Sequence, residues 1–291
     1  MIVSSEFEKV AGGFQFVEGP VWLDDKHPLT ALTGESTECL VFSDIPASRL
    51  YWYRAGQTGI LREATGQANG SALDAEGGLL SCEHQNRRVS RMVGSGSVET
   101  VVDSFAGKRL NSPNDIVVRS DGMIFFTDPP YGVTADEREL GFQGVYCLNP
   151  RHMQPMLLRD DFENPNGLAF SVDEGELFIA DTGKGQLRKF IVEQNGTLSN
   201  EQVFCKCDRP DGLCLDQEGN VWVACLCGIE VFAADGRRIA SVDLPERPAN
   251  LAFGDADAQS VYICARTSIY RLRSTVAGAV HPEGKLQGCQ L

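Results

Sequence analysis

Apolar and polar residues alternate along this chain in short runs, and turn-forming pairs separate the runs. This pattern predicts β-strands joined as hairpins, because the side chains of a strand point alternately to its two faces. The clearest hairpin lies within residues 111–132. Its strands would be Ile116–Arg119 and Met123–Thr127, joined by a two-residue turn at Asp121 and Gly122.

Three polar residues gather at the open end of this hairpin. With a two-residue turn, Asp115 would face Asp128 across the strand pair, and Asn114 would face Pro129. We therefore expect Asn114, Asp115 and Asp128 to lie close together. For Asp128 this placement favours a chemical role over a purely structural turn, because functional residues concentrate where loops meet a rigid scaffold.

The same unit recurs along the whole chain. Each copy begins with a polar residue, here called the anchor, followed by an apolar strand, a polar turn and a second apolar strand. The six anchors are Glu18, Asn69, Asn114, Asn166, Asp211 and Asn250. They recur every 39 to 52 residues, and repeats of this length built from short strands predict a β-propeller with one blade per repeat.

The expected fold is therefore all-β, a six-bladed β-propeller with four-stranded antiparallel blades. Six blades of about 48 residues use the whole of residues 1–291, so one domain is expected. A strand at Phe14–Val17 would close the ring by completing the last blade beside Ile269–Leu272.

The anchors suggest a metal site. Because the innermost strand of each blade lines the axis, the anchors would converge at one end of the central channel. Glu18 and Asp211 would repel each other there and raise each other's pKa unless a cation lay between them. Carboxylate and amide oxygens suit Ca²⁺, with Mg²⁺, Mn²⁺ or Zn²⁺ as alternatives, and Zn²⁺ is disfavoured because no His or Cys shares the anchor position. A turn-forming role beside Gly explains any one anchor, but not why six share one register.

Charge and composition limit the classes of partner that we expect this protein to bind. The formal net charge of −14 argues against nucleic acid and against an anionic membrane surface. No apolar run approaches a membrane span, and the N-terminus lacks the pattern of a secretory signal, so a cytoplasmic protein is expected. The ten Cys include two C-x-C pairs, Cys205/Cys207 and Cys225/Cys227, which we interpret as reduced structural thiols in preference to a soft-metal site.

Five short motifs are specific in combination. They are E-G-P-V-W from Glu18, S-P-N-D from Ser112, F-T-D-P-P-Y-G from Phe126, P-N-G-L from Pro165 and P-D-G from Pro210. With them, essentially the whole chain resembles the regucalcin/gluconolactonase (senescence marker protein-type) family of six-bladed propellers. The double proline and the stretch C-E-H-Q-N-R-R-V from Cys82 are similar to its bacterial gluconolactonase-like branch.

The resemblance implies a hydrolase of sugar lactones such as gluconolactone, with one catalytic divalent cation. It implies that the cation is held by Glu18, Asn114, Asn166 and Asp211. It also implies that Asp211 is the general base as well as a ligand, with Asp115 and Asp128 as rivals for the base. One departure concerns the substrate: animal members carry an Arg shortly before the Asn-Asp pair, where this chain reads N-S-P from Asn111.

The mechanism expected is addition of water to a cation-polarised lactone carbonyl, with a carboxylate taking the proton. Sugar hydroxyls would be held by Asn69, His84, Asn111 and Tyr131, although a simple loop hydrogen bond is an equal reading of His84. The partner would be a small-molecule sugar lactone, and the protein a monomer or a weak homo-oligomer. The alternatives are a phosphotriesterase of the diisopropylfluorophosphatase kind and a calcium- or sugar-binding propeller without turnover.

Overall fold

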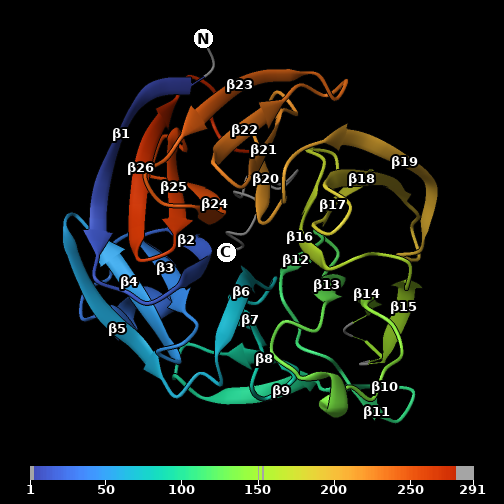
Figure 1. Cartoon of the computed structure of the whole chain (residues 1–291). Helices are drawn as coiled ribbons and strands as arrows, with labels where there is room; N and C mark the ends of the chain where they lie inside the picture. The colour runs from blue at the N-terminus through green and yellow to red at the C-terminus, as the bar shows by residue number, and fades with distance from the viewer. Residues whose placement is uncertain (1–2, 150, 153, 280–291) are drawn as a thin grey trace.

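The computed structural model describes residues 3–149, 151–152 and 154–279. Within these residues, six four-stranded antiparallel sheets surround one axis (Figure 1). The six-bladed all-β propeller predicted from the repeats is confirmed. None of the helices in this part of the chain is long and apolar enough to cross a membrane.

Five blades each use four consecutive strands. Blade 1 contains β2 (Val17–Leu23), β3 (Cys39–Asp44), β4 (Arg49–Arg54) and β5 (Gln57–Glu63), and blade 2 contains β6 (Ala68–Leu73), β7 (Leu79–Glu83), β8 (Arg88–Met92) and β9 (Val98–Val102). Blade 3 contains β12 (Ile116–Val118), β13 (Ile124–Asp128), β14 (Gly144–Leu148) and β15 (Pro155–Arg159). Blade 4 contains β16 (Pro165–Phe170), β17 (Glu176–Asp181), β18 (Gln186–Val192) and β19 (Leu198–Lys206), and blade 5 contains β20 (Leu213–Leu215), β21 (Val221–Ala224), β22 (Gly228–Phe232) and β23 (Arg238–Asp243). The connections carry the 3-10 helices η1 (Pro28–Thr33) and η2 (Ala135–Glu137) and the small hairpin β10 (Ser104–Phe105) with β11 (Lys108–Arg109).

Blade 6 is completed by both ends of the chain. It contains β24 (Pro248–Gly254), β25 (Ser260–Ala265), β26 (Ser268–Ser274) and, outermost, β1 (Val3–Gly12) (Figure 1). The predicted partner strand, within β26, is correct, but the closing strand predicted at Phe14–Val17 is wrong. Gly13, at φ 95°, takes the chain out of β1, and Phe14 packs instead against Phe42 and Tyr51, with both ring centroids 5.1 Å away.

The buried apolar side chains form clusters between neighbouring blades. Trp22 of blade 1 stacks on Tyr262 of blade 6 with ring centroids 5.2 Å apart, and Phe125 of blade 3 meets Phe170 of blade 4 edge-on at 5.1 Å. Similar clusters occupy the remaining interfaces. Because the inner strands of the blades are buried on both faces in this way, they hold the loops at the channel mouth in place.

The hairpin of blade 3 turns through three residues, 120–122, where the sequence predicted a two-residue turn. The backbone N–H of Arg119 donates to the carbonyl of Met123 at 2.8 Å, and Gly122 adopts the left-handed conformation at φ 88°. Three-residue hairpins commonly end in such a Gly. The register consequently slips by one position, so that Ile116 pairs with Phe126.

This slip changes which side chain reaches the channel, because successive residues of a strand point to opposite faces. Thr127, not Asp128, lies opposite Asp115 and donates its backbone N–H to the Asp115 carbonyl at 3.0 Å. The prediction that Asp115 faces Asp128 is therefore wrong. Thr127 also donates from Oγ1 to the carbonyl of Asn166 at 2.9 Å, which links blade 3 to blade 4 at the anchors.

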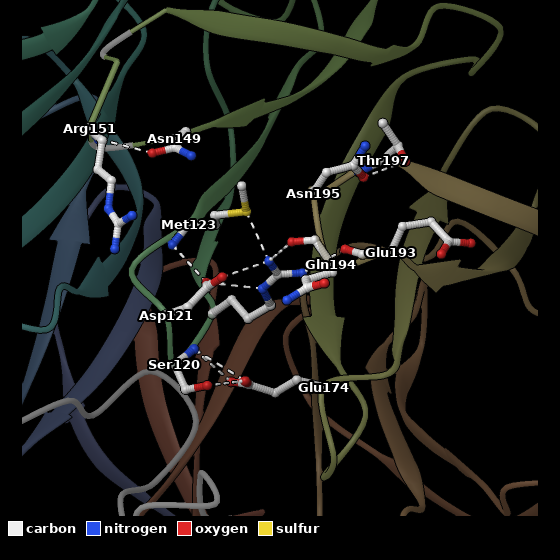
Figure 2. Close-up of polar contacts among 11 residues, drawn as sticks. Ser120, Asp121, Met123, Asn149, Arg151, Glu174, Glu193, Gln194, Asn195 and Thr197 are labelled. Atoms are coloured by element: carbon white, nitrogen blue, oxygen red, sulfur yellow. Dashed lines mark hydrogen bonds and ion pairs between the residues drawn. The ribbon is translucent and has the colours of Figure 1, made fainter.

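The far end of the same hairpin is fastened to blade 4 (Figure 2). The backbone N–H of Ser120 donates to the Glu174 carboxylate at 3.0 Å. Arg119 donates to the carbonyls of Glu193 at 3.0 Å and Gln194 at 2.9 Å. Blades 3 and 4 are thus tied at both ends, which fixes the position of their anchors relative to each other.

Candidate active site

The anchors are brought together by direct backbone contact between neighbouring blades. The N–H of Gly70 donates to the carbonyl of Asn114 at 2.8 Å, and the N–H of Gly167 donates to that of Asp211 at 3.2 Å. A Cβ at either glycine would overlap the backbone it contacts. The Gly that follows these anchors therefore lets the inner strands approach closely enough to form the channel.

Gly19 is the strictest of these positions, and Gly19→Ala should destabilise the protein by roughly 3 kcal/mol or more. Its φ is 53°, and an added Cβ would overlap the carbonyl of Asn69. The matched control is Gly96→Ala, where φ is 79° but nothing lies within 4 Å of the added atom, so the cost should be about 1 kcal/mol. Urea unfolding of both variants measures the difference, and equal losses would show that the close approach of blades 1 and 2 contributes nothing.

A β-bulge accompanies the anchor in four of the blades. The strand register shifts by one residue beside Glu18, Asn69, Asn166 and Asn250. An extra residue re-aims the side chain relative to the rest of its strand. The anchors can therefore point into the channel while the apolar residues that follow keep their places between the blades.

Two buried carboxylates and an amide form the centre of the site. Asn250 donates from Nδ2 to Glu18 Oε2 at 3.0 Å and to Asp115 Oδ2 at 3.4 Å. Asp211 pairs with Arg247 at 3.4 Å. Side chains from blades 1, 3, 5 and 6 thus meet at one end of the channel, as the repeat predicts.

The carboxyl groups of this site lie in an environment that disfavours their ionised form. Burial raises the pKa of Glu18 to about 7, against hydrogen bonds from Gly19 and Asn250. Burial and then the charge of Glu18 raise the pKa of Asp115 to about 8. Burial and the Glu18 charge also raise the pKa of Asp211 well above its ordinary value, although Arg247 lowers it. One arginine does not offset the repulsion among these carboxylates, which a bound cation would remove.

The residues of the site fit a hard divalent cation. Glu18, Asn114, Asn166 and Asp211 are all buried and offer carboxylate or amide oxygens, and Asn166 hydrogen-bonds Asp211. The buried Oδ1 of Asn69 has no hydrogen-bond partner among the described residues. Nowhere in that part of the chain do three or more His, Cys, Asp or Glu side chains form a metal-binding group. Amide oxygens and water would therefore complete the coordination, as Ca²⁺ tolerates.

Three of the predicted substrate contacts lie around the anchors. Asn69 Nδ2 lies 3.1 Å from His84 Nε2, so these two side chains are in contact. Burial lowers the pKa of His84 to about 4, and its imidazole is consequently neutral at pH 7. Tyr131 is half exposed, and its hydroxyl hydrogen-bonds Thr182 and Asn166 beside the charge of Asp211.

Asp128 and Asn111 lie apart from this group. The carboxylate of Asp128 accepts the backbone N–H of Asn111 at 2.8 Å, and the Asn111 amide donates to the carbonyls of Asp128 and Phe142, both at 3.0 Å. Burial raises the pKa of Asp128 to about 7. Within the described residues, no hydrogen bond or ion pair joins either side chain to an anchor. The slipped register explains this, since it turns Asp128 to the face opposite Asp115.

The sequence reasoning passed over Arg247 and Thr127. Arg247 comes three residues before the anchor Asn250 and contacts Asp211, an anchor of another blade. A basic residue shortly before an anchor in such an acidic chain was an available signal. Thr127 became important only through the register of its hairpin, which the sequence did not reveal.

A cleft of about 550 Å³ opens beside the anchors, with Tyr131 and Arg247 in its wall. A smaller cavity of about 60 Å³ lies within the channel and is lined by Asp115 and Asn250. The cleft has the volume of a small-molecule site. It borders Asp211 through Arg247, whose guanidinium lies 3.4 Å from that carboxylate.

Comparison with known proteins agrees with this architecture. The SMP-30/gluconolactonase/LRE-like region matches residues 16–267 of the chain. The gluconolactonase of Zymomonas mobilis is 28% identical, with 95% of this chain and 83% of the relative covered. Regucalcin of Sus scrofa is also 28% identical, over 87% and 84%. The structure of a gluconolactonase from Xanthomonas campestris superposes with a TM-score of 0.82 at 32% identity, covering 92% of this chain and 89% of that one. The chain belongs to the SMP-30/gluconolactonase/LRE-like family.

Proposed function

We propose that this protein is a metal-dependent lactonase that opens sugar lactones by hydrolysis. The observation that carries the proposal is the meeting of Glu18 and Asp211 with the anchor amides beside a cleft of small-molecule size. The gluconolactonases of Z. mobilis and X. campestris support the reaction class.

Glu18, Asn114, Asn166 and Asp211 would hold one divalent cation, with Ca²⁺ preferred for an all-oxygen set. When bound, the cation would polarise the lactone carbonyl and stabilise the charge that develops on its oxygen.

The protein's own groups would then handle the proton. Asp211 takes a proton from the attacking water, and Arg247, 3.4 Å away, stabilises its ionised form. Asp115 is the rival base, since its carboxylate lies beside Glu18 and Asn250. Tyr131 and the Asn69–His84 pair would hold sugar hydroxyls, and their position beside the anchors supports this role. Asp128 is not part of the proposed mechanism, because its contacts are with the loop at Asn111.

A pH-indicator assay of acid release from a panel of aldonolactones tests the proposal. The protein is stripped with chelator and refilled separately with Ca²⁺, Mg²⁺, Mn²⁺ and Zn²⁺. We expect hydrolysis of at least one lactone only after refilling. If no lactone is hydrolysed with any metal, while a metal still raises the melting temperature, the lactonase proposal is overturned. Phosphotriesters tested in the same assay then decide between another hydrolase and a binding protein without turnover.

A further inference from the structure

The cleft beside the anchors is lined by more positive than negative side chains. Lys184, Arg209 and Arg247 contribute three cations to its wall, and Asp208 is the carboxylate among its lining residues. This excess occurs in a chain whose formal net charge is −14. A local reversal of charge in a cleft concentrates ligands of the opposite sign.

The three cations differ in how far the protein itself neutralises them. Arg247 is paired with Asp211 at 3.4 Å. Lys184 lies 3.7 Å from Asp181 and donates to the carbonyl of Asp161 at 3.0 Å. The side chain of Arg209 is exposed and makes no ion pair or hydrogen bond with any residue of the described part of the chain. Arg209 is therefore the guanidinium available to a ligand.

The position of Arg209 relates it directly to the proposed chemistry. It lies two residues before Asp211, and the same cleft wall carries Tyr131, whose hydroxyl hydrogen-bonds Asn166. A molecule with its ester at the anchors would extend past Tyr131 toward Arg209 and Lys184. A guanidinium binds carboxylate and phosphate through paired N–H donors, which a neutral hydroxyl does not match.

We propose that the preferred substrate is an anionic sugar lactone, with a carboxylate or phosphate at the end remote from the ester, held by Arg209 with Lys184. The inference rests on the proposed lactonase function and specifies its substrate class. Water adds to the lactone carbonyl carbon, the ring C–O bond breaks, and the ring oxygen takes a proton. The new carboxyl group ionises, so the product carries one more negative charge than the substrate, and no oxidant or reductant is needed.

Three lactones of matched ring size test the proposal in the metal-loaded enzyme: a neutral one, one with a terminal carboxylate and one with a terminal phosphate. We expect kcat/KM for one of the anionic lactones to exceed that for the neutral lactone at least tenfold. Arg209→Gln should reduce this anionic-to-neutral ratio about tenfold. The control is Arg237→Gln, which removes the same charge from an exposed turn at the opposite end of blade 5 and should leave the ratio as it is.

Calorimetric titration with the ring-opened product of the carboxylate lactone, which is a dianion, gives a readout that does not depend on turnover. Arg209→Gln should weaken its binding about tenfold, with an unchanged melting temperature showing that the variant is folded. Equal kcat/KM for neutral and anionic lactones, with a ratio unaffected by Arg209→Gln, would overturn the anionic substrate while leaving the lactonase intact. Dianion binding that depends on Arg209 in a protein that hydrolyses no lactone would overturn the lactonase and support the anion subsite.

Discussion

Asp211→Asn should abolish lactone hydrolysis, with kcat reduced roughly a thousandfold or more. The substitution keeps the shape of the side chain and an oxygen that can ligate a cation. It removes the negative charge and the proton acceptor. Because burial and Glu18 already raise the pKa of Asp211, the neutral amide costs the folded protein little, and the variant should melt no lower than the wild type. Initial rates in metal-saturated protein measure the effect.

Asp235→Asn is the matched control for this substitution. Asp235 is exposed in the turn between β22 and β23 and accepts the backbone N–H of Arg237, a contact that Asn can also make. It should retain full activity. If Asp211→Asn keeps more than about a tenth of the wild-type kcat, the base lies elsewhere, and Asp115→Asn becomes the decisive variant.

Removal of the metal should have the second largest effect, because it acts on activity and stability together. At a thousandfold excess over its Kd, a bound cation stabilises the folded protein by about 4 kcal/mol, which corresponds to a melting temperature on the order of 10 °C higher. Chelator should therefore abolish turnover and lower the melting temperature. Re-addition of Ca²⁺ should restore both, as scanning calorimetry and the acid-release assay would show.

The loss of stability should depend on pH in a direction fixed by the carboxylates. The folded-state pKa is about 7 for Glu18 and about 8 for Asp115, above the ordinary values of these groups. Between about pH 4 and pH 8 the metal-free folded protein thus binds more protons than the unfolded chain, and its stability falls as pH rises. A cation that keeps these groups ionised removes that dependence. The gain in melting temperature from Ca²⁺ should be larger at pH 8 than at pH 5, by roughly 5 °C.

Glu246 provides an internal reference for the pH series. Desolvation acts to raise the pKa of Glu246, but the hydroxyls of Ser268 and Thr267 lower it to about 2. Its contribution to stability is present above its unfolded pKa and is lost only on acidification toward pH 2, outside the pH range in which Glu18 and Asp115 titrate.

A Ca²⁺-induced gain in melting temperature that is equal at pH 5 and pH 8 would contradict a cation bound among the carboxylates whose pKa is raised.

The blades were predictable from the sequence because their information is local and repeated. Each unit carries its own alternation and turn residues, and Glu18, Asn69 and the other anchors recur at one place in the unit. Their convergence follows from closing six equivalent strands around an axis.

The errors arose at turns, where the backbone conformation of one residue decides the register or the end of a strand. The three-residue turn at 120–122 places Thr127 opposite Asp115 and turns Asp128 toward Asn111. The closing strand is β1 and not Phe14–Val17. Gly13 takes the chain out of β1, and Phe14 then packs against Phe42 instead of pairing with β26. Both differences depend on left-handed backbone at a single Gly, which several turn types share.

The sequence by itself determined the number of blades, their order and the chemical character of the anchors, since these follow from periodicity and residue type. Only the tertiary structure decided which side chains meet. Arg247 reaches Asp211, Asn250 joins Glu18 to Asp115, and the β-bulges aim the anchors into the channel. These contacts join residues distant in the chain, up to 232 positions apart. Their geometry depends on how closely neighbouring blades pack, and no local pattern in the sequence encodes that.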